Sequence, residues 1–113
     1  MDNRRQFVRI PFYEAVGYQR LEQSSLEGSL AGDISQGGLK LSVNEFIPLE
    51  TVLELQIRLP GQIQVIPARA KVVWIKELPY RDDSWEIGVQ LAPNTPSLFA
   101  IRDYIGLRRF EPI

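Results

Sequence analysis

Short alternations of apolar and polar residues fill the middle of the chain, between residues 13 and 92. In the stretch 53–59, for example, each odd position holds Leu or Ile, whereas the even positions hold Glu, Gln and Arg. A period of two is that of a β-strand with one buried face and one exposed face. Six such runs, separated by turns rich in Gly and Pro, predict an all-β domain, either a small antiparallel barrel or a sandwich.

Two of these runs carry features that affect the direction of their side chains. In the fifth run, Trp74 continues the alternation of Ala70 and Val72, which favours a core position for the indole over a position near a surface site. Pro67 in the same stretch indicates an edge position or a β-bulge, because proline cannot donate to the strand ladder. In the stretch 26–34, Leu30 and Ile34 share a face, so the alternation predicts that both point inward.

The C-terminal tail is the one part of the chain with helical spacing. Thr95 is placed to cap a helix whose first residue is Pro96, and Ile101 and Ile105 then fall on one face. We therefore expect a single domain over residues 1–113. Its parts are a flexible arm over 1–12, a β-barrel over 13–92 and a C-terminal helix over 95–110.

The composition excludes several classes of function. The 113 residues are 44% hydrophobic and 24% charged, which is typical of one globular domain. The chain has no His and no Cys, so it lacks a Ser-His-Asp triad, a thiolate nucleophile and the usual metal ligands, and we expect no catalytic residue, metal or cofactor. A net charge of −1 does not favour nucleic-acid binding or a polybasic membrane contact. Without cysteines or a recognisable secretory signal, we expect a cytoplasmic protein with no membrane insertion.

The N-terminal arm concentrates positive charge. Arg4, Arg5 and Arg9 lie within six residues, and the last two have the spacing R-x-x-x-R. A guanidinium can bind phosphate through two hydrogen bonds and can stack on a nucleobase. A solvated arm without a ligand is the alternative interpretation. Because these like charges repel one another, we expect the arm to be mobile until an anionic ligand neutralises it.

A second polar group lies in the stretch Asp33-Ile34-Ser35-Gln36-Gly37-Gly38. With Ile34 inward, Asp33 and Ser35 lie together on the outer face of the strand. The two glycines permit a left-handed turn or the close approach of a ligand to the backbone. A hairpin turn capped by the Asp and Ser side chains is the alternative. A carboxylate accepts from guanine N1–H and from the N2 amino group, so both motifs together predict a guanine-nucleotide site with no catalytic group.

In these residues the sequence resembles the PilZ domain, a bacterial receptor for cyclic di-GMP. The family pattern R-x-x-x-R is matched by Arg5 and Arg9, and the pattern D/N-x-S-x-x-G by Asp33, Ser35 and Gly38. The resemblance covers nearly the whole chain and implies a six-stranded antiparallel β-barrel, the PilZ-like split barrel, with a C-terminal α-helix. It also implies that the arginines hold phosphate and guanine, that the Asp and Ser read a guanine with its neighbouring ribose–phosphate, and that the glycine clears space for the ligand.

The resemblance adds Arg4 as a ligand contact, and Gly37 and Trp74 as possible ones. A basic residue at the position of Arg4 is associated in the family with a stacked pair of ligands, so we expect two cyclic di-GMP molecules per chain. A domain without an effector would signal to an unidentified partner protein. The main alternative is a PilZ-like adaptor that binds proteins but no nucleotide. An enzyme is disfavoured because Ser35 has no His to activate it, and a single-strand nucleic-acid barrel because the chain lacks a basic, aromatic groove.

Overall fold

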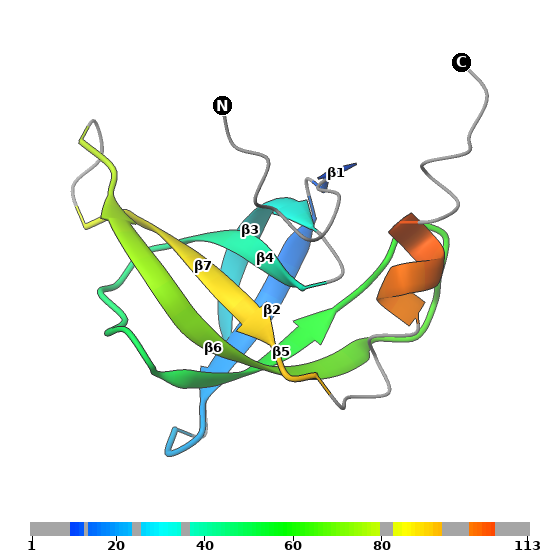
Figure 1. Cartoon of the computed structure of the whole chain (residues 1–113), viewed down its shortest axis with the longest axis horizontal. Coiled ribbons are helices and arrows are strands. Elements are labelled where there is room, and N and C mark those ends of the chain that lie inside the picture. Colours follow the sequence, from blue (N-terminus) through cyan, green and yellow to red (C-terminus); the bar gives the residue numbers. More distant parts are fainter. Residues whose placement is uncertain are drawn as a thin grey trace.

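Strands make up most of the described chain in the computed structural model, and six of them close a barrel (Figure 1). The structure describes residues 10–12, 14–23, 26–34, 37–79, 83–93 and 100–105. Its strands are β1 (Ile10–Pro11), β2 (Ala15–Arg20), β3 (Glu27–Ile34), β4 (Gly38–Val43), β5 (Val52–Ile57), β6 (Ile66–Glu77) and β7 (Trp85–Leu91). The antiparallel order β2-β5-β6-β7-β4-β3 closes on itself because β3 pairs with both β4 and β2. The predicted six-stranded barrel is therefore confirmed, with β1 as a two-residue addition beside β3.

Aliphatic side chains from the inward faces of the strands fill the barrel. Along β5, Leu53, Leu55 and Ile57 are completely buried, as the alternation predicts. Burial of an aliphatic side chain of this size contributes about 1.5–3 kcal/mol. Ser29 on β3 is the polar exception, and its hydroxyl donates a 2.6 Å hydrogen bond to the Val16 carbonyl. The interior is thus a packed core rather than a channel.

The proline in β6 lies where the strand has a neighbour on one side. Pro67 is opposite Gln56 of β5, whereas β7 begins to pair with β6 only at Ala70. The missing N–H therefore costs no ladder hydrogen bond. The edge position predicted from the sequence is confirmed.

The described part of the C-terminal helix, residues 100–105, stands at one end of the barrel, on the right in Figure 1. Ile101 and Ile105 are buried, as their helical spacing predicts. The Tyr104 ring packs edge-on against Phe12, with the ring centroids 5.8 Å apart. The predicted cap at Thr95 and Pro96 lies outside the described residues. No helix within the described ranges is long and apolar enough to cross a membrane.

Candidate functional site

A β-bulge in β3 lies directly before Asp33. The register between β3 and β4 shifts between Ala31 and Asp33, so that Gly32 and Asp33 together oppose Lys40. The prediction that Leu30 points inward together with Ile34 is wrong: Leu30 is 58% exposed, whereas Ile34 is completely buried. The extra residue in the bulge reverses the alternation between these two positions. Asp33 does lie on the outer face, as predicted from its position next to the inward Ile34.

On that outer face, the Lys40 ammonium lies between two carboxylates from the neighbouring strands. Its Nζ is 3.6 Å from Oδ2 of Asp33 on β3 and 3.9 Å from Oε2 of Glu86 on β7. Charge-assisted hydrogen bonds are typically about 2.7–2.9 Å long, so both contacts are loose ion pairs. The Asp33 and Glu86 side chains are 21% and 23% exposed. Both carboxylates are therefore partly exposed to solvent.

A second bulge, in β6, turns Trp74 outward. The register between β6 and β7 shifts between Val72 and Trp74, and Trp74 then pairs with Gly88. A Cβ atom on Gly88 would lie 2.1 Å from Trp74 Nε1, so the indole lies directly against the glycine backbone. The predicted core position of Trp74 is therefore wrong, and Ile75 is the residue that packs against the core instead. The alternation of apolar and polar residues stops at positions 72–75, where four apolar residues follow one another, so the sequence alone does not say which of them faces the core.

These residues form a continuous row across four strands. Asp33 is opposite Lys40, Lys40 is opposite Gly88, and Gly88 is opposite Trp74. Together with Glu86 we call this row the outer wall. Strands in a sheet are about 4.8 Å apart, so roughly 14 Å separates the two ends of the row. The outer wall thus presents a carboxylate at one end and a flat aromatic ring at the other, with a cation between them.

Gly38 is required by the packing of the barrel itself. A Cβ atom at this position would lie 2.0 Å from the Val89 carbonyl oxygen on β7, a backbone atom that cannot move without breaking the strand pairing. Gly38 begins β4 without a left-handed conformation, so of the two uses that the glycines permit, a left-handed turn is not the one seen at Gly38. The neighbouring Gly37 carbonyl accepts a 2.8 Å hydrogen bond from the Leu91 amide. A role of either glycine toward a ligand stays a prediction.

The structure places only part of the predicted site. Asp33, Gly37, Gly38 and Trp74 are described, whereas Arg4, Arg5, Arg9 and Ser35 lie outside the described residues. Sequence reasoning missed the contributions of Lys40, Glu86 and Gly88. The outward positions of Lys40 and Glu86 follow from alternation, but their convergence on Asp33 depends on pairing between three strands. Within the described ranges, no cluster of three or more acidic side chains could hold a metal ion.

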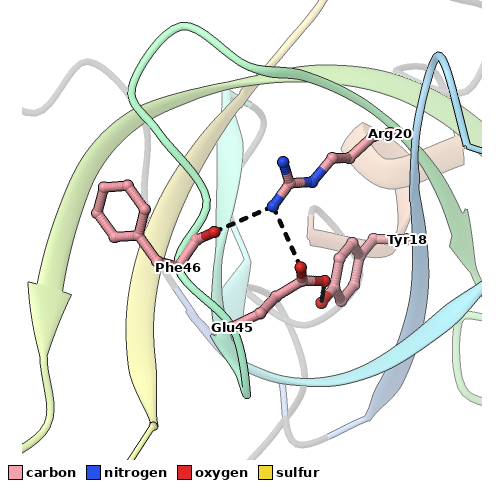
Figure 2. A network of polar contacts seen from close by, with 4 residues as sticks. All are labelled: Tyr18, Arg20, Glu45 and Phe46. Atoms are coloured by element: carbon pink, nitrogen blue, oxygen red, sulfur yellow. Dashed lines mark hydrogen bonds and ion pairs between the residues drawn. The ribbon is translucent and has the colours of Figure 1, made fainter.

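A second polar cluster lies inside one end of the barrel, and we call it the barrel mouth. Figure 2 shows the Glu45 carboxylate pointing toward both Tyr18 and Arg20 within the ring of strands. The Tyr18 hydroxyl donates a 2.7 Å hydrogen bond to Oε2 of Glu45, and the Arg20 guanidinium donates to Oε1 at 3.1 Å and to the Phe46 carbonyl at 3.0 Å. Burial, followed by the hydrogen bond to Glu45, raises the pKa of Tyr18 well above its ordinary value. These close contacts join β2 to the segment after β4.

Comparisons with known proteins support the fold. A family model described as the PilZ domain matches residues 3–106. The solved structure of the Bacillus subtilis inhibitor of motility has a TM-score of 0.76 and 22% identity, and the match covers 99% of this chain and 55% of that one. YcgR from Escherichia coli in complex with c-di-GMP has a TM-score of 0.68 and 19% identity, with 94% and 46% covered. The MrkH–c-di-GMP complex of K. pneumonia has a TM-score of 0.69 and 14% identity, with 97% and 54% covered.

At these identities the shared feature is the fold. The chain spans about half the length of each of these three proteins. No curated protein sequence matches the chain.

Proposed function

This chain belongs to the PilZ domain family, and we propose that it is a non-enzymatic receptor for cyclic di-GMP. The observation that carries the proposal is the position of Asp33. Its carboxylate lies on the outer wall, partly exposed and 3.6 Å from the Lys40 ammonium. The solved c-di-GMP complexes of YcgR and MrkH, which share the fold, support this class of ligand.

Each residue type on and near the outer wall suits one part of a guanine dinucleotide. The Asp33 carboxylate accepts from guanine N1–H and N2, and adenine offers no donor at N1. The Trp74 ring offers a flat face against which a base can stack. Arg5 and Arg9 of the family motif supply bidentate cations for the phosphates. Ser35, two residues after Asp33 in the sequence, supplies a hydroxyl group.

The proposal includes the output of the receptor. Residues 10–12, at the end of the predicted arm, already pair with β3 or pack against Tyr104. Binding of the ligand would neutralise Arg4, Arg5 and Arg9, which precede β1, and order that part of the arm against the outer wall, which creates a new surface for an unidentified partner protein. Arg4 provides a third cation in the same arm, and we propose that it allows two stacked ligand molecules to bind per chain. The chain would act in the cytoplasm as an adaptor between nucleotide and partner.

Calorimetric titration with cyclic di-GMP tests the proposal. We expect saturable binding with two ligands per chain. Loss of a charged hydrogen-bond partner costs about 1.5–3 kcal/mol, so Asp33→Asn should weaken binding roughly 10- to 150-fold. Glu54→Gln is the matched control, because Glu54 also forms an outward ion pair, with Arg69, but on a strand that pairs with neither β3 nor β4.

The possible outcomes separate the parts of the proposal. No binding by the unmodified protein would contradict the receptor function and favour the adaptor that binds no nucleotide. One ligand per chain would contradict the stacked pair alone. Equal affinity for cyclic di-AMP would contradict the role given to Asp33, because a carboxylate cannot accept from the unprotonated N1 of adenine.

A further inference from the structure

Lys40 is the cation of the outer wall, and it is held only loosely. Its two ion pairs, with Asp33 at 3.6 Å and with Glu86 at 3.9 Å, both exceed hydrogen-bond length. The Lys40 side chain is 32% exposed. Ion pairs of this kind contribute little to stability, because water competes for both charges. The ammonium can therefore change partner at small cost.

The bulge in β3 shapes the path of this lysine along the wall. A Cβ atom on Gly32 would lie 3.1 Å from Lys40 Cε, so the absence of a side chain at Gly32 leaves room for the lysine stem. Because Gly32 and Asp33 together oppose Lys40, the stem crosses the glycine and brings the ammonium to the aspartate. The same extra residue thus supplies the space through which Lys40 reaches Asp33.

The charges of the outer wall are unequal. One ammonium forms ion pairs with two carboxylates, so the group formed by Lys40, Asp33 and Glu86 carries a net charge of −1. A phosphodiester that approaches this group is repelled by Glu86 and attracted by Lys40. A compact ammonium on a flexible stem is well suited to turn from a carboxylate to a phosphate.

We propose that Lys40 is a ligand-contacting residue that exchanges its ion pair with Asp33 for one with a phosphate of the bound nucleotide. The Asp33 carboxylate then accepts from guanine, while Glu86 opposes the exchange by retaining the ammonium. The inference rests on the proposed receptor function. It assigns a binding role to a residue outside both sequence motifs, and an opposing role to Glu86.

Titration of four proteins with cyclic di-GMP at one low salt concentration tests the inference. Lys40→Met removes the charge but keeps the stem, and we expect roughly 5- to 20-fold weaker binding than in the unmodified protein. Glu86→Gln releases Lys40 from one carboxylate and removes a repulsion, and we expect binding about 2- to 5-fold tighter. Lys71→Met is the matched control, because Lys71 is an outward lysine paired at 3.4 Å with Glu50, and we expect its affinity to stay within about 2-fold of the unmodified protein.

The two substitutions are expected to change the affinity in opposite directions, and this distinguishes a ligand contact from a structural role. If Lys40 only held the strands together, removal of either member of the ion pair would disturb the wall in the same sense, and thermal unfolding would reveal the loss. Unchanged affinity in Lys40→Met, with normal binding by the unmodified protein, overturns the role of Lys40 and leaves the receptor function standing. Weaker binding in Glu86→Gln overturns the exchange. Absence of binding in the unmodified protein overturns the receptor function and this inference with it.

Discussion

The outer wall and the barrel mouth each join an acidic side chain to a basic one, but their geometry differs. At the barrel mouth, Glu45 accepts hydrogen bonds of 2.7 Å and 3.1 Å from Tyr18 and Arg20, and Tyr18 is only 2% exposed. On the outer wall, the charged atoms of Lys40 and Asp33 are 3.6 Å apart, although these side chains are about as exposed as those of Arg20 and Glu45. A close hydrogen bond to a buried hydroxyl fixes a structure, whereas an ion pair beyond hydrogen-bond length leaves its ammonium able to bind something else.

One hydrogen-bond donor at the barrel mouth, the Nε atom of Arg20, is unpaired in the part of the chain that the structure describes. Arg20 Nε is buried without a hydrogen-bond partner among the described residues. An unpaired buried donor has a free-energy cost, which the remaining contacts of Arg20 to Glu45 and to the Phe46 carbonyl must offset. The close contacts to Glu45 indicate a structural role for the barrel mouth, and the binding role proposed above concerns the outer wall.

The largest expected effect on stability comes from Glu45→Ala at the barrel mouth. The substitution removes the acceptor of the Tyr18 hydroxyl and one of the two acceptors of the Arg20 guanidinium, and we expect the free energy of unfolding to fall by about 2–3 kcal/mol. Glu54→Ala is the matched control: Glu54 is also 37% exposed and bound by an arginine, but that arginine is 60% exposed, so a loss of at most about 1 kcal/mol is expected. Chemical denaturation measures both. Equal losses would remove the distinction between the two kinds of site.

A smaller effect on stability is expected from Gly88→Ala on the outer wall. The new methyl group would occupy the space of the Trp74 indole, which must move outward, and we expect a loss of about 1–2 kcal/mol. The wall should also lose its aromatic face, so cyclic di-GMP should bind more weakly and the tryptophan fluorescence should change. Gly28→Ala is the control, since nothing lies within 4 Å of the added atom. A changed fluorescence together with an unaltered affinity in Gly88→Ala would show that Trp74 has no part in binding.

The smallest effect is a pH dependence at the barrel mouth. The pKa of Tyr18 is raised in the folded chain, so the unfolded chain releases this proton first, at about pH 10. The stabilisation is complete below that pH and is lost as the pH rises above it, by up to about 1.4 kcal/mol per pH unit. We expect Tyr18→Phe to cost about 1 kcal/mol at pH 8 and progressively less between pH 10 and 11. Denaturant titrations across this range, with Tyr104→Phe as control, measure the difference, and a constant difference would contradict the assignment.

Sequence periodicity was sufficient to predict most of the fold. The six strands, the inward face of β5 and the burial of Ile101 and Ile105 follow from the spacing of apolar residues, because burial of one face is what stabilises each element. The outward position of Asp33 was also predicted correctly. The arginine motif came from the sequence as well, and its place in space lies outside the described residues.

Only the tertiary structure shows the two positions at which the alternation of inward and outward side chains is broken. The bulges before Asp33 and Trp74 each insert one residue relative to the neighbouring strand, which separates Leu30 from Ile34 and turns Trp74 out of the core. A bulge is a property of two paired strands, so a single strand's sequence does not reveal it. The meeting of Lys40 with Asp33 and Glu86 likewise depends on the register of β3, β4 and β7, which closure of the barrel determines. The sequence thus determines which residue types can bind a nucleotide. Their arrangement into one surface depends on pairing between strands that are distant along the chain.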